Sequence, residues 1–193
     1  MARDTSLSDP EGAWLLAYAA GDPQAASVLS RALGPRAYAQ AYRMLADAAE
    51  AEDVAQEALI RLWKIAPEWR PGEAKVSTWL YRVVANLAVD RLRRRRREAP
   101  LEAAGEPAAP GATPVERLQD GARAQALSEA LAALPDRQAQ AVALRHLEGL
   151  GNPEIAAIMD MSVAAVESLT ARGKRALTQA LLPQKARLGW TDD

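Results

Sequence analysis

Hydrophobic residues recur every three to four positions along nearly all of the chain, with polar residues between them. This spacing is typical of amphipathic α-helices, whereas strands alternate hydrophobic and polar residues. Glycine, proline and aspartate interrupt the pattern, most clearly at Gly21-Asp22-Pro23 and Gly34-Pro35. The pattern therefore predicts an all-α fold. In the first half we expect helices near 10–20, 23–33, 35–46, 50–66 and 76–97.

The pattern lapses between Glu98 and Pro114, where alanine, glycine, glutamate and four prolines replace it. Proline removes a helical hydrogen bond and the segment has no apolar face to bury, so we expect a flexible linker over 98–113. Thr113-Pro114-Val115-Glu116 then has the form of a capping box with proline at the first helical position. The second half should hold helices over 114–133, 136–148, 153–159 and 163–181. The sequence thus predicts two small helical domains, residues 1–97 and 114–193.

The formal net charge of −1 over 193 residues gives by itself no reason to expect a nucleic-acid partner. Divided at the linker, however, residues 1–97 carry 15 Lys and Arg against 12 Asp and Glu, whereas residues 98–193 carry 9 against 13. Six of the seven residues from 91 to 97 are arginine. Like charges crowded over two helical turns repel one another and are best relieved by a polyanion. The first domain is therefore a candidate for binding nucleic acid.

Several kinds of chemistry are excluded by composition. The chain has no cysteine, which excludes disulfides, thiolate-bound zinc and a cysteine nucleophile. His146 is the only histidine, so a multi-histidine metal site is impossible. The first ten residues are polar and no apolar run approaches the roughly 20 residues of a membrane span, so we expect a cytoplasmic protein with no membrane insertion of its own. We expect no cofactor and no enzymatic activity.

The expected helix 76–97 has two distinct faces. Its apolar stripe consists of Val76, Leu80, Val83, Val84 and Leu87. A separate sector carries Trp79, Arg82, Asn86, Asp90 and Arg93. An aromatic ring stacks on unpaired bases, an amide bonds base edges and arginine holds phosphates, so this sector suits single-stranded nucleic acid. The alternative is that Trp79 belongs to the core and that the arginines are a solvated helix end.

The expected helix 50–66 begins with acidic residues, which are favourable at the positive end of the helix dipole. One side of this helix carries Asp53, Gln56, Glu57 and Arg61, which indicates a docking face for a partner. A metal site built on Asp53 and Glu57 is the alternative, although no histidine is placed to complete it.

Residues 152–175 predict a helix-turn-helix. Asn152 is a candidate cap for the first helix and Ser162 for the second. Ile155, Ile158 and Met161 should face Val166 and Leu169 across the turn. The outward positions of the second helix are Ala164, Ala165, Glu167, Ser168, Ala171 and Arg172, with Lys174 and Arg175 following them. Small residues allow close approach to a groove, and the polar ones can contact base edges and phosphates.

Taken together, these segments resemble the extracytoplasmic-function group of the sigma-70 family of bacterial sigma factors. The resemblance is carried by residues 51–63 (AEDVAQEALIRLW), 78–86 (TWLYRVVAN), Leu134-Pro135 and 152–159 (NPEIAAIM). It implies that residues 1–97 bind RNA polymerase and open the minus-10 promoter element. It also implies that residues 114–193 bind the duplex minus-35 element and that the linker threads toward the polymerase active site.

The resemblance also assigns roles to individual residues. Core polymerase would contact Asp53, Gln56, Glu57 and Arg61. The melted minus-10 strand would meet Lys75, Trp79, Arg82, Asn86 and Asp90, helped by the loop 68–75, while Arg93 to Arg97 hold its backbone. The minus-35 element would meet Ala164, Glu167, Ser168, Ala171, Arg172, Lys174 and Arg175. Some positions depart from the family pattern: Glu167, Leu169 and Ala171 stand where basic or aromatic residues are common, and Asp90 where an amide is frequent.

The expected partners are therefore core RNA polymerase, promoter DNA and an anti-sigma factor that covers both domains. Two other functions compete with this interpretation. One is a self-sufficient helix-turn-helix repressor or activator, which would dimerise and bind duplex DNA tightly by itself. The other is a nucleic-acid enzyme that holds a metal on Glu52, Asp53 and Glu57.

Overall fold

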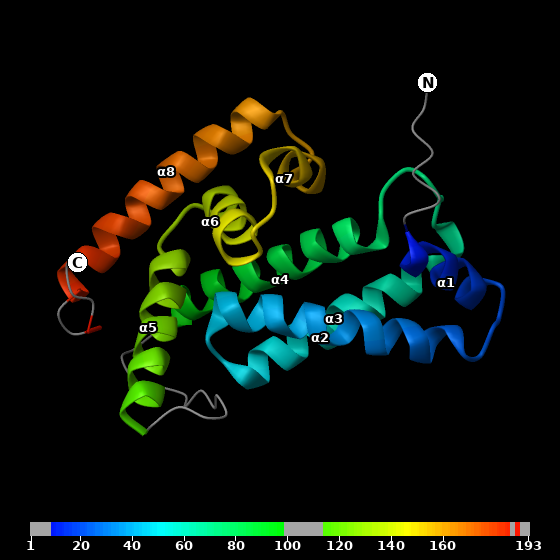
Figure 1. Cartoon of the computed structure of the whole chain (residues 1–193), viewed down its shortest axis with the longest axis horizontal. Helices are drawn as coiled ribbons and strands as arrows, with labels where there is room; N and C mark the ends of the chain where they lie inside the picture. The colour runs from blue at the N-terminus through cyan, green and yellow to red at the C-terminus, as the bar shows by residue number, and fades with distance from the viewer. Residues whose placement is uncertain (1–8, 99–113, 186–187, 190–193) are drawn as a thin grey trace.

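The computed structural model describes residues 9–98, 114–185 and 188–189, and every regular element in these ranges is helical (Figure 1). The first half comprises α1 (Pro10–Ala19), α2 (Ala25–Leu45), α3 (Ala48–Ile65), the 3-10 turn η2 (Ala66–Glu68) and α4 (Val76–Glu98). The second half comprises α5 (Pro114–Ala132), α6 (Asp136–Val142), the π-helical turn η3 (Ala143–Leu147), α7 (Asn152–Met159), α8 (Val163–Leu181) and η4 (Leu182–Gln184). The all-α prediction is confirmed.

Some sequence predictions fall outside this description. Residues 99–113, which hold nearly all of the expected linker and Thr113 of the expected capping box, lie outside the described residues. Of the helices that the structure does describe, none is both long enough and apolar enough to span a membrane.

One predicted helix break is wrong. The sequence predicts separate helices over 23–33 and 35–46, but α2 runs unbroken through Pro35. A proline inside a helix costs about 3 kcal/mol, because it lacks the N–H that would bond to the preceding turn. Leu29 and Leu33, in the two turns before the proline, are fully buried, and each such burial contributes about 1.5–3 kcal/mol. Packing of α2 therefore outweighs the local preference for a break.

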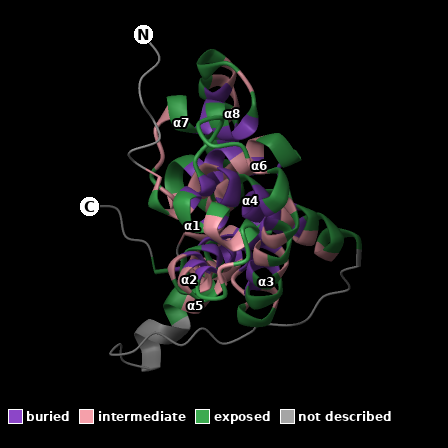
Figure 2. Cartoon of the chain, turned by 90° about the vertical axis from the view of Figure 1, so that its right-hand side faces the viewer, coloured by how far each residue is buried: buried purple, intermediate pink, exposed green. Residues whose placement is uncertain are grey.

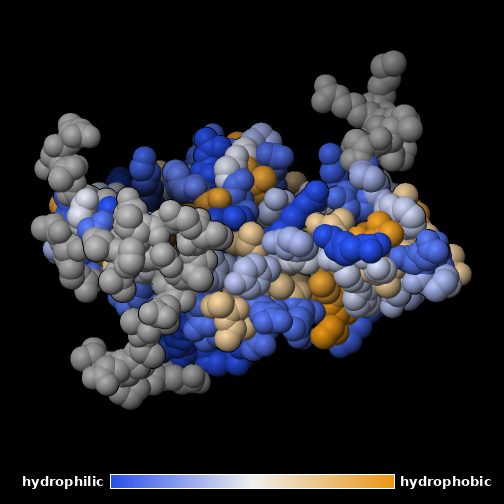
Figure 3. All heavy atoms as spheres, turned by 60° about the horizontal axis from the view of Figure 1, so that its bottom comes forward, coloured by the Kyte–Doolittle hydropathy of each residue, from blue (hydrophilic) through white to orange (hydrophobic). Residues whose placement is uncertain are grey.

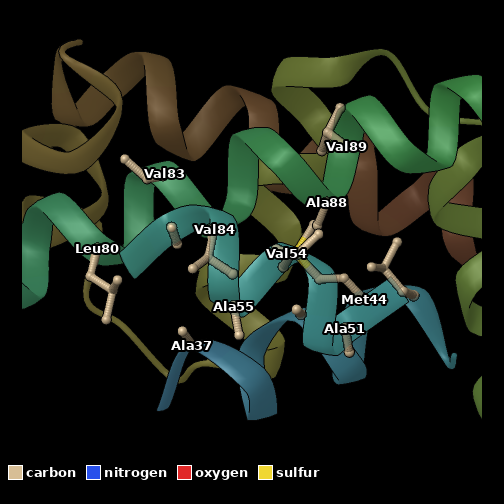
Figure 4. Packing of buried hydrophobic residues seen from close by; sticks show 14 of the residues in the cluster. Ala37, Met44, Ala51, Val54, Ala55, Leu80, Val83, Val84, Ala88 and Val89 are labelled. Carbon is tan, nitrogen blue, oxygen red and sulfur yellow. The ribbon is translucent and has the colours of Figure 1, made fainter. Parts of the chain in front are cut away.

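Helix α4 is the central element of the fold (Figure 1): α2 and α3 pack against it on one side, and α6 and α7 on another. The predicted apolar stripe is buried from Val76 to Val84. In Figure 4, Leu80 and Val84 point toward α2 and α3, whereas Val83 and Val89 point to the opposite side of α4. Helix α4 thus buries more of its circumference than an amphipathic surface helix does, which Figure 2 shows as buried residues gathered around it.

The two domains are closed onto each other. Helix α5 contacts both α2 and α4. Leu131 and Val142 of the second half belong to the buried cluster that forms the core of the first half. A second cluster joins Ala85 of α4 to Ile155 of α7. The two halves of the chain therefore share a continuous core, which the sequence does not predict.

Candidate nucleic-acid interface

The polar face of α4 is largely as the sequence predicts. Arg82, Asn86, Asp90 and Arg93 are all exposed, and so is Lys75 in the loop before the helix. Their spacing of three to four residues places the four helical side chains on one side of α4. Cations and an amide are therefore displayed together, as a surface for unpaired bases and phosphates requires.

Trp79 lies on the same side of α4 by its spacing, but its ring is buried, so the expectation of a ring free to stack on bases is not met in this structure. Its exposed fraction is 8%, and it packs within the main core. A tryptophan buries more apolar area than most side chains, so once α4 is packed on two sides the ring is most stable inside. The alternative stated for Trp79 from the sequence, a core residue, is the one that the structure supports.

The second half of the chain contacts the polar face of α4. The Gln140 amide donates a hydrogen bond to Asn86 Oδ1 at 2.7 Å. The Arg93 guanidinium lies 3.4 Å from the Asp90 carboxylate and 3.6 Å from the Asp136 carboxylate of α6. In this closed arrangement, two of the groups expected to read DNA are engaged by α6. Sequence reasoning missed Gln140 and Asp136, because the contact joins segments about 50 residues apart in the chain.

Arg95 has a structural role, which corrects the expectation that Arg93 to Arg97 all face the nucleic-acid backbone. Arg95 Nη1 donates to the Leu45 carbonyl at 2.8 Å and Nε donates to Glu50 Oε1 at 2.9 Å. Arg95 Nη2 lies 2.9 Å from the Asp47 carboxylate. This guanidinium therefore fixes the turn between α2 and α3. The remaining exposed arginines at the end of α4 are Arg94, Arg96 and Arg97.

The predicted helix-turn-helix is confirmed in α7 and α8. Ile155, Ile158 and Val166 are buried between the two helices. Asp160 adopts a left-handed conformation (φ 52°) that ends α7, and the Ser162 hydroxyl accepts a hydrogen bond from the Ala165 N–H at 3.2 Å, as expected of a cap.

The start of α7 differs by one residue from the prediction. The N-cap residue is Gly151 rather than Asn152. The Glu154 carboxylate accepts a hydrogen bond from the Gly151 N–H at 2.8 Å. Asn152 instead donates from Nδ2 to Glu167 Oε1 of α8 at 3.4 Å. The amide of Asn152 therefore ties the two helices of the motif together.

The outward side of α8 is open. The exposed residues of this side are Ala164, Glu167, Ala171, Arg172, Lys174 and Arg175, and Ala165 and Ser168 are half-buried. Arg172 donates to Ser168 Oγ from Nη2 at 2.6 Å and from Nε at 3.2 Å. These bonds hold the guanidinium along the helix surface, where it is pre-positioned for a base edge or phosphate.

The inward side of α8 is packed closely on α6 through a glycine. A Cβ added at Gly173 would stand 2.4 Å from Val142 Cγ2 and 3.3 Å from the Gln138 carbonyl oxygen. Real side chains do not approach this closely, so Gly173 sets the distance between α6 and α8 and thereby supports the outward side.

An apolar groove of about 470 Å³ lies between α5, α6 and α8, with Leu131 and Leu177 in its lining and His146 beside them. Burial lowers the pKa of the His146 imidazole, and the charges of Lys174 and Arg145 lower it further. The imidazole is therefore neutral at neutral pH.

The four residues predicted to form a docking face lie on one side of α3. Asp53, Gln56 and Arg61 are exposed and Glu57 is half-buried. Arg61 Nε donates to Glu57 Oε1 at 2.8 Å, and this hydrogen bond lowers the pKa of Glu57. Ile60, 45% exposed, lies on the same side. Sequence reasoning missed Ile60. It could have been found from the sequence, because its position is out of phase with the buried hydrophobic residues of this helix.

In the view of Figure 3 most of the surface is hydrophilic, with hydrophobic residues in small separate groups. A single exposed isoleucine within a charged face is the pattern of an anchor surrounded by polar contacts. Among the described residues no three His, Cys, Asp or Glu side chains gather as metal ligands, so Glu52, Asp53 and Glu57 form no such site.

The helical fold agrees with the matches to known families. Residues 29–98 match the model of Sigma-70 region 2, and residues 124–177 match that of Sigma-70, region 4. The chain is 30% identical over 171 residues to the ECF RNA polymerase sigma factor SigW of Bacillus subtilis, which covers 83% of this chain and 91% of that protein.

Solved structures of similar fold include CnrH in complex with the cytosolic domain of CnrY. It aligns with a TM-score of 0.65 and 22% identity over 90% of this chain and 97% of that one. The sigma factor RpoE of Bartonella quintana, in complex with the anti-sigma factor NepR, aligns with a TM-score of 0.58 and 22% identity over 82% of this chain and 97% of that one.

The helical fold, with a region-2 domain followed by a region-4 helix-turn-helix, defines a bacterial sigma factor. The chain therefore belongs to the sigma-70 family, within its extracytoplasmic-function group.

Proposed function

We propose that this sigma factor docks on core RNA polymerase through α3, reads the melted minus-10 element with α4 and reads the duplex minus-35 element with α8. The observation that carries the proposal is the presence, in one chain, of an exposed polar face on α4 and a helix-turn-helix with an open outward side. None of these roles requires covalent chemistry or a cofactor.

On α4, Asn86 bonds the edge of an unpaired base, while Arg82, Arg93 and the nearby Lys75 hold phosphates. The carboxylate of Asp90 lies 3.4 Å from Arg93 and orients that guanidinium. Trp79 supports this face from the core instead of stacking on bases.

On α8, Arg172 and Ser168 reach base edges together, since they are already hydrogen-bonded to each other. Glu167 accepts from an exocyclic amine of cytosine, the pairing that a carboxylate favours in the major groove. Ala164 and Ala171 allow close approach of the helix, and Lys174 and Arg175 hold phosphates.

On α3, Asp53, Gln56, Glu57 and Arg61 form the polar part of the polymerase contact, and Ile60 is its apolar anchor. The ion pair between Glu57 and Arg61, 2.8 Å long, keeps these two side chains next to each other on this face.

Polymerase would hold the two DNA-reading domains at the spacing of the promoter, so each weak contact raises the effective concentration of the other. Flipped bases captured on α4 offset the cost of unpairing. Because Gln140 occupies Asn86 in the closed arrangement, DNA reading requires α6 to leave α4. An anti-sigma factor, of the kind bound in the Bartonella quintana complex, would hold the two domains away from DNA.

Reconstitution with core RNA polymerase and a promoter library tests the proposal. The expected result is comigration with core enzyme and initiation from a defined class of promoters. Asn86→Ala should lower promoter opening and leave polymerase affinity unchanged, whereas Ile60→Asp should lower polymerase affinity. If the protein neither comigrates with core enzyme nor directs initiation from any promoter, the proposed function is wrong. Tight duplex binding by a dimer without polymerase would favour a self-sufficient regulator instead.

A further inference from the structure

We propose that Asp9 is a positioning residue for the DNA-reading end of α4, because its carboxylate caps two helices at once. Asp9 Oδ1 accepts a hydrogen bond from the Gly12 N–H at 3.2 Å, which caps α1. Asp9 Oδ2 accepts a hydrogen bond from the Val76 N–H, also at 3.2 Å, and Val76 is the first residue of α4. This inference rests on the proposed role of α4 in reading the minus-10 strand.

Helix α4 lacks a cap from its own sequence at this position. The first N–H groups of a helix have no partner within it, and a side-chain oxygen just before the helix usually accepts from one of them. The residue before α4 is Lys75, whose ammonium group can donate hydrogen bonds but cannot accept one. Val76 is fully buried. The acceptor for its N–H therefore comes from Asp9, 67 residues earlier in the chain.

Gly12 is the residue that makes the shared cap possible. A Cβ added at Gly12 would stand 2.6 Å from Asp9 Oδ2, the oxygen that accepts from Val76. Any larger residue at this position displaces that oxygen, while leaving the charge of Asp9 in place. The pair Asp9 and Gly12 thus provides two independent ways to remove the same hydrogen bond.

The functional consequence concerns the loop that enters α4. In Figure 1 this loop and the start of α4 lie beside α1. Lys75, the last residue of the loop, is exposed, and Arg82 and Asn86 follow within the next turns of the helix. By fixing where α4 begins, Asp9 fixes the position of Lys75 relative to Arg82 and Asn86. The spacing of these three side chains sets where a single strand can bind. Asp9 itself contacts no nucleic acid in this role.

The test compares three variants of the full chain. Asp9→Ser keeps a hydroxyl that can cap α1 but is too short to reach Val76. Gly12→Ala displaces the carboxylate, keeps its charge and adds a better helix former to α1. Asp22→Ser is the matched control, because Asp22 accepts from the Gln24 N–H at 2.8 Å on the surface and lies outside α4.

The primary measurement is the affinity of each holoenzyme for a single-stranded minus-10 oligonucleotide. Asp9→Ser and Gly12→Ala each remove this cap of α4, so each should weaken this affinity up to about fivefold. Hydrogen exchange at the Val76 amide should accelerate in both variants by a similar factor. Affinities for core polymerase and for minus-35 duplex should remain unchanged, which a general loss of folding would not allow. Asp22→Ser should change none of these quantities.

Two results would overturn the inference: unchanged oligonucleotide affinity in Asp9→Ser and Gly12→Ala, or an equal loss in Asp22→Ser. If the unaltered protein directs initiation in the same experiments, such a result removes the role of Asp9 alone. If the unaltered protein shows no initiation on any promoter, the proposed function fails and the role of Asp9 in it fails too. The exchange rate at Val76 reports the cap separately in either case.

Discussion

Removing the Glu148 side chain should open the contact between the two domains. Arg43 of α2 donates to Glu148, which follows η3, through two hydrogen bonds of 3.0 and 2.5 Å. The side chain of Glu148 is 5% exposed and that of Arg43 is 42% exposed. Glu148→Ala therefore returns Arg43 to water without leaving a buried charge unpaired. The reciprocal variant, Arg43→Ala, would strand the carboxylate and is a less direct test.

The size of the effect follows from these exposures. Hydrogen bonds to charged groups contribute about 1.5–3 kcal/mol, and the exposure of Arg43 reduces this to about 1–2 kcal/mol. The ratio of open to closed molecules should then rise about 5- to 30-fold. Under the proposed function only the open form binds a minus-10 strand, so the affinity of the free protein for a single-stranded oligonucleotide should rise by the same factor as long as the open form is the minor one.

Single-molecule energy transfer measures this ratio directly. The chain has no cysteine, so dyes on Ala20→Cys of the first half and Gln179→Cys of the second are the only labels introduced. Glu11→Ala is the matched control, because Glu11 pairs with Arg36 at 2.8 Å within the first half. An open fraction that is the same in Glu148→Ala, Glu11→Ala and the unaltered protein would refute the assignment of this ion pair to the closed state.

Three further predictions concern stability. Arg95→Ala should lower the free energy of unfolding by about 1–3 kcal/mol in denaturant titration, because it leaves half-buried acceptors unpaired, whereas Arg94→Ala on the surface should change it by less than about 0.5 kcal/mol. Gly173→Ala should lower the free energy of unfolding by about 1–3 kcal/mol, because the added methyl group overpacks the contact with α6. Gly34→Ala should raise it by about 0.5–1 kcal/mol, because its added Cβ meets only one atom, at 3.8 Å. Calorimetry that ranks the two variants in the opposite order would contradict the packing argument. Because the pKa of His146 is lowered in the folded protein, the unfolded chain binds a proton at this imidazole more readily. The stability that is present above about pH 6.5 should therefore fall as the pH drops below that value. Thermal melts from pH 7.5 to 5.5 should show a weaker pH dependence in His146→Gln than in the unaltered protein.

Features that depend on neighbouring residues can be predicted from the amino-acid sequence alone. The hydrophobic period sets the helices, and it correctly places the buried stripe from Val76 to Val84 and the buried pair Ile155 and Val166. The Ser162 cap acts over three residues and was predicted for the same reason. The motifs of the sigma-70 family lie within single helices or helical hairpins, so they too can be read without tertiary contacts.

Features that depend on residues far apart in the chain become visible only in the folded protein. Pro35 lies inside a helix because α2 is held by packing on both sides of it, and Trp79 is buried because α4 is covered on two sides. The hydrogen bond at Asn86 comes from Gln140 in the second half of the chain, and the acceptor for the first N–H of α4 comes from Asp9. The hydrophobic pattern of a helix predicts which of its sides faces away from water. The pattern does not predict which residues cover that side, because those hydrogen bonds and apolar contacts form between segments far apart in sequence.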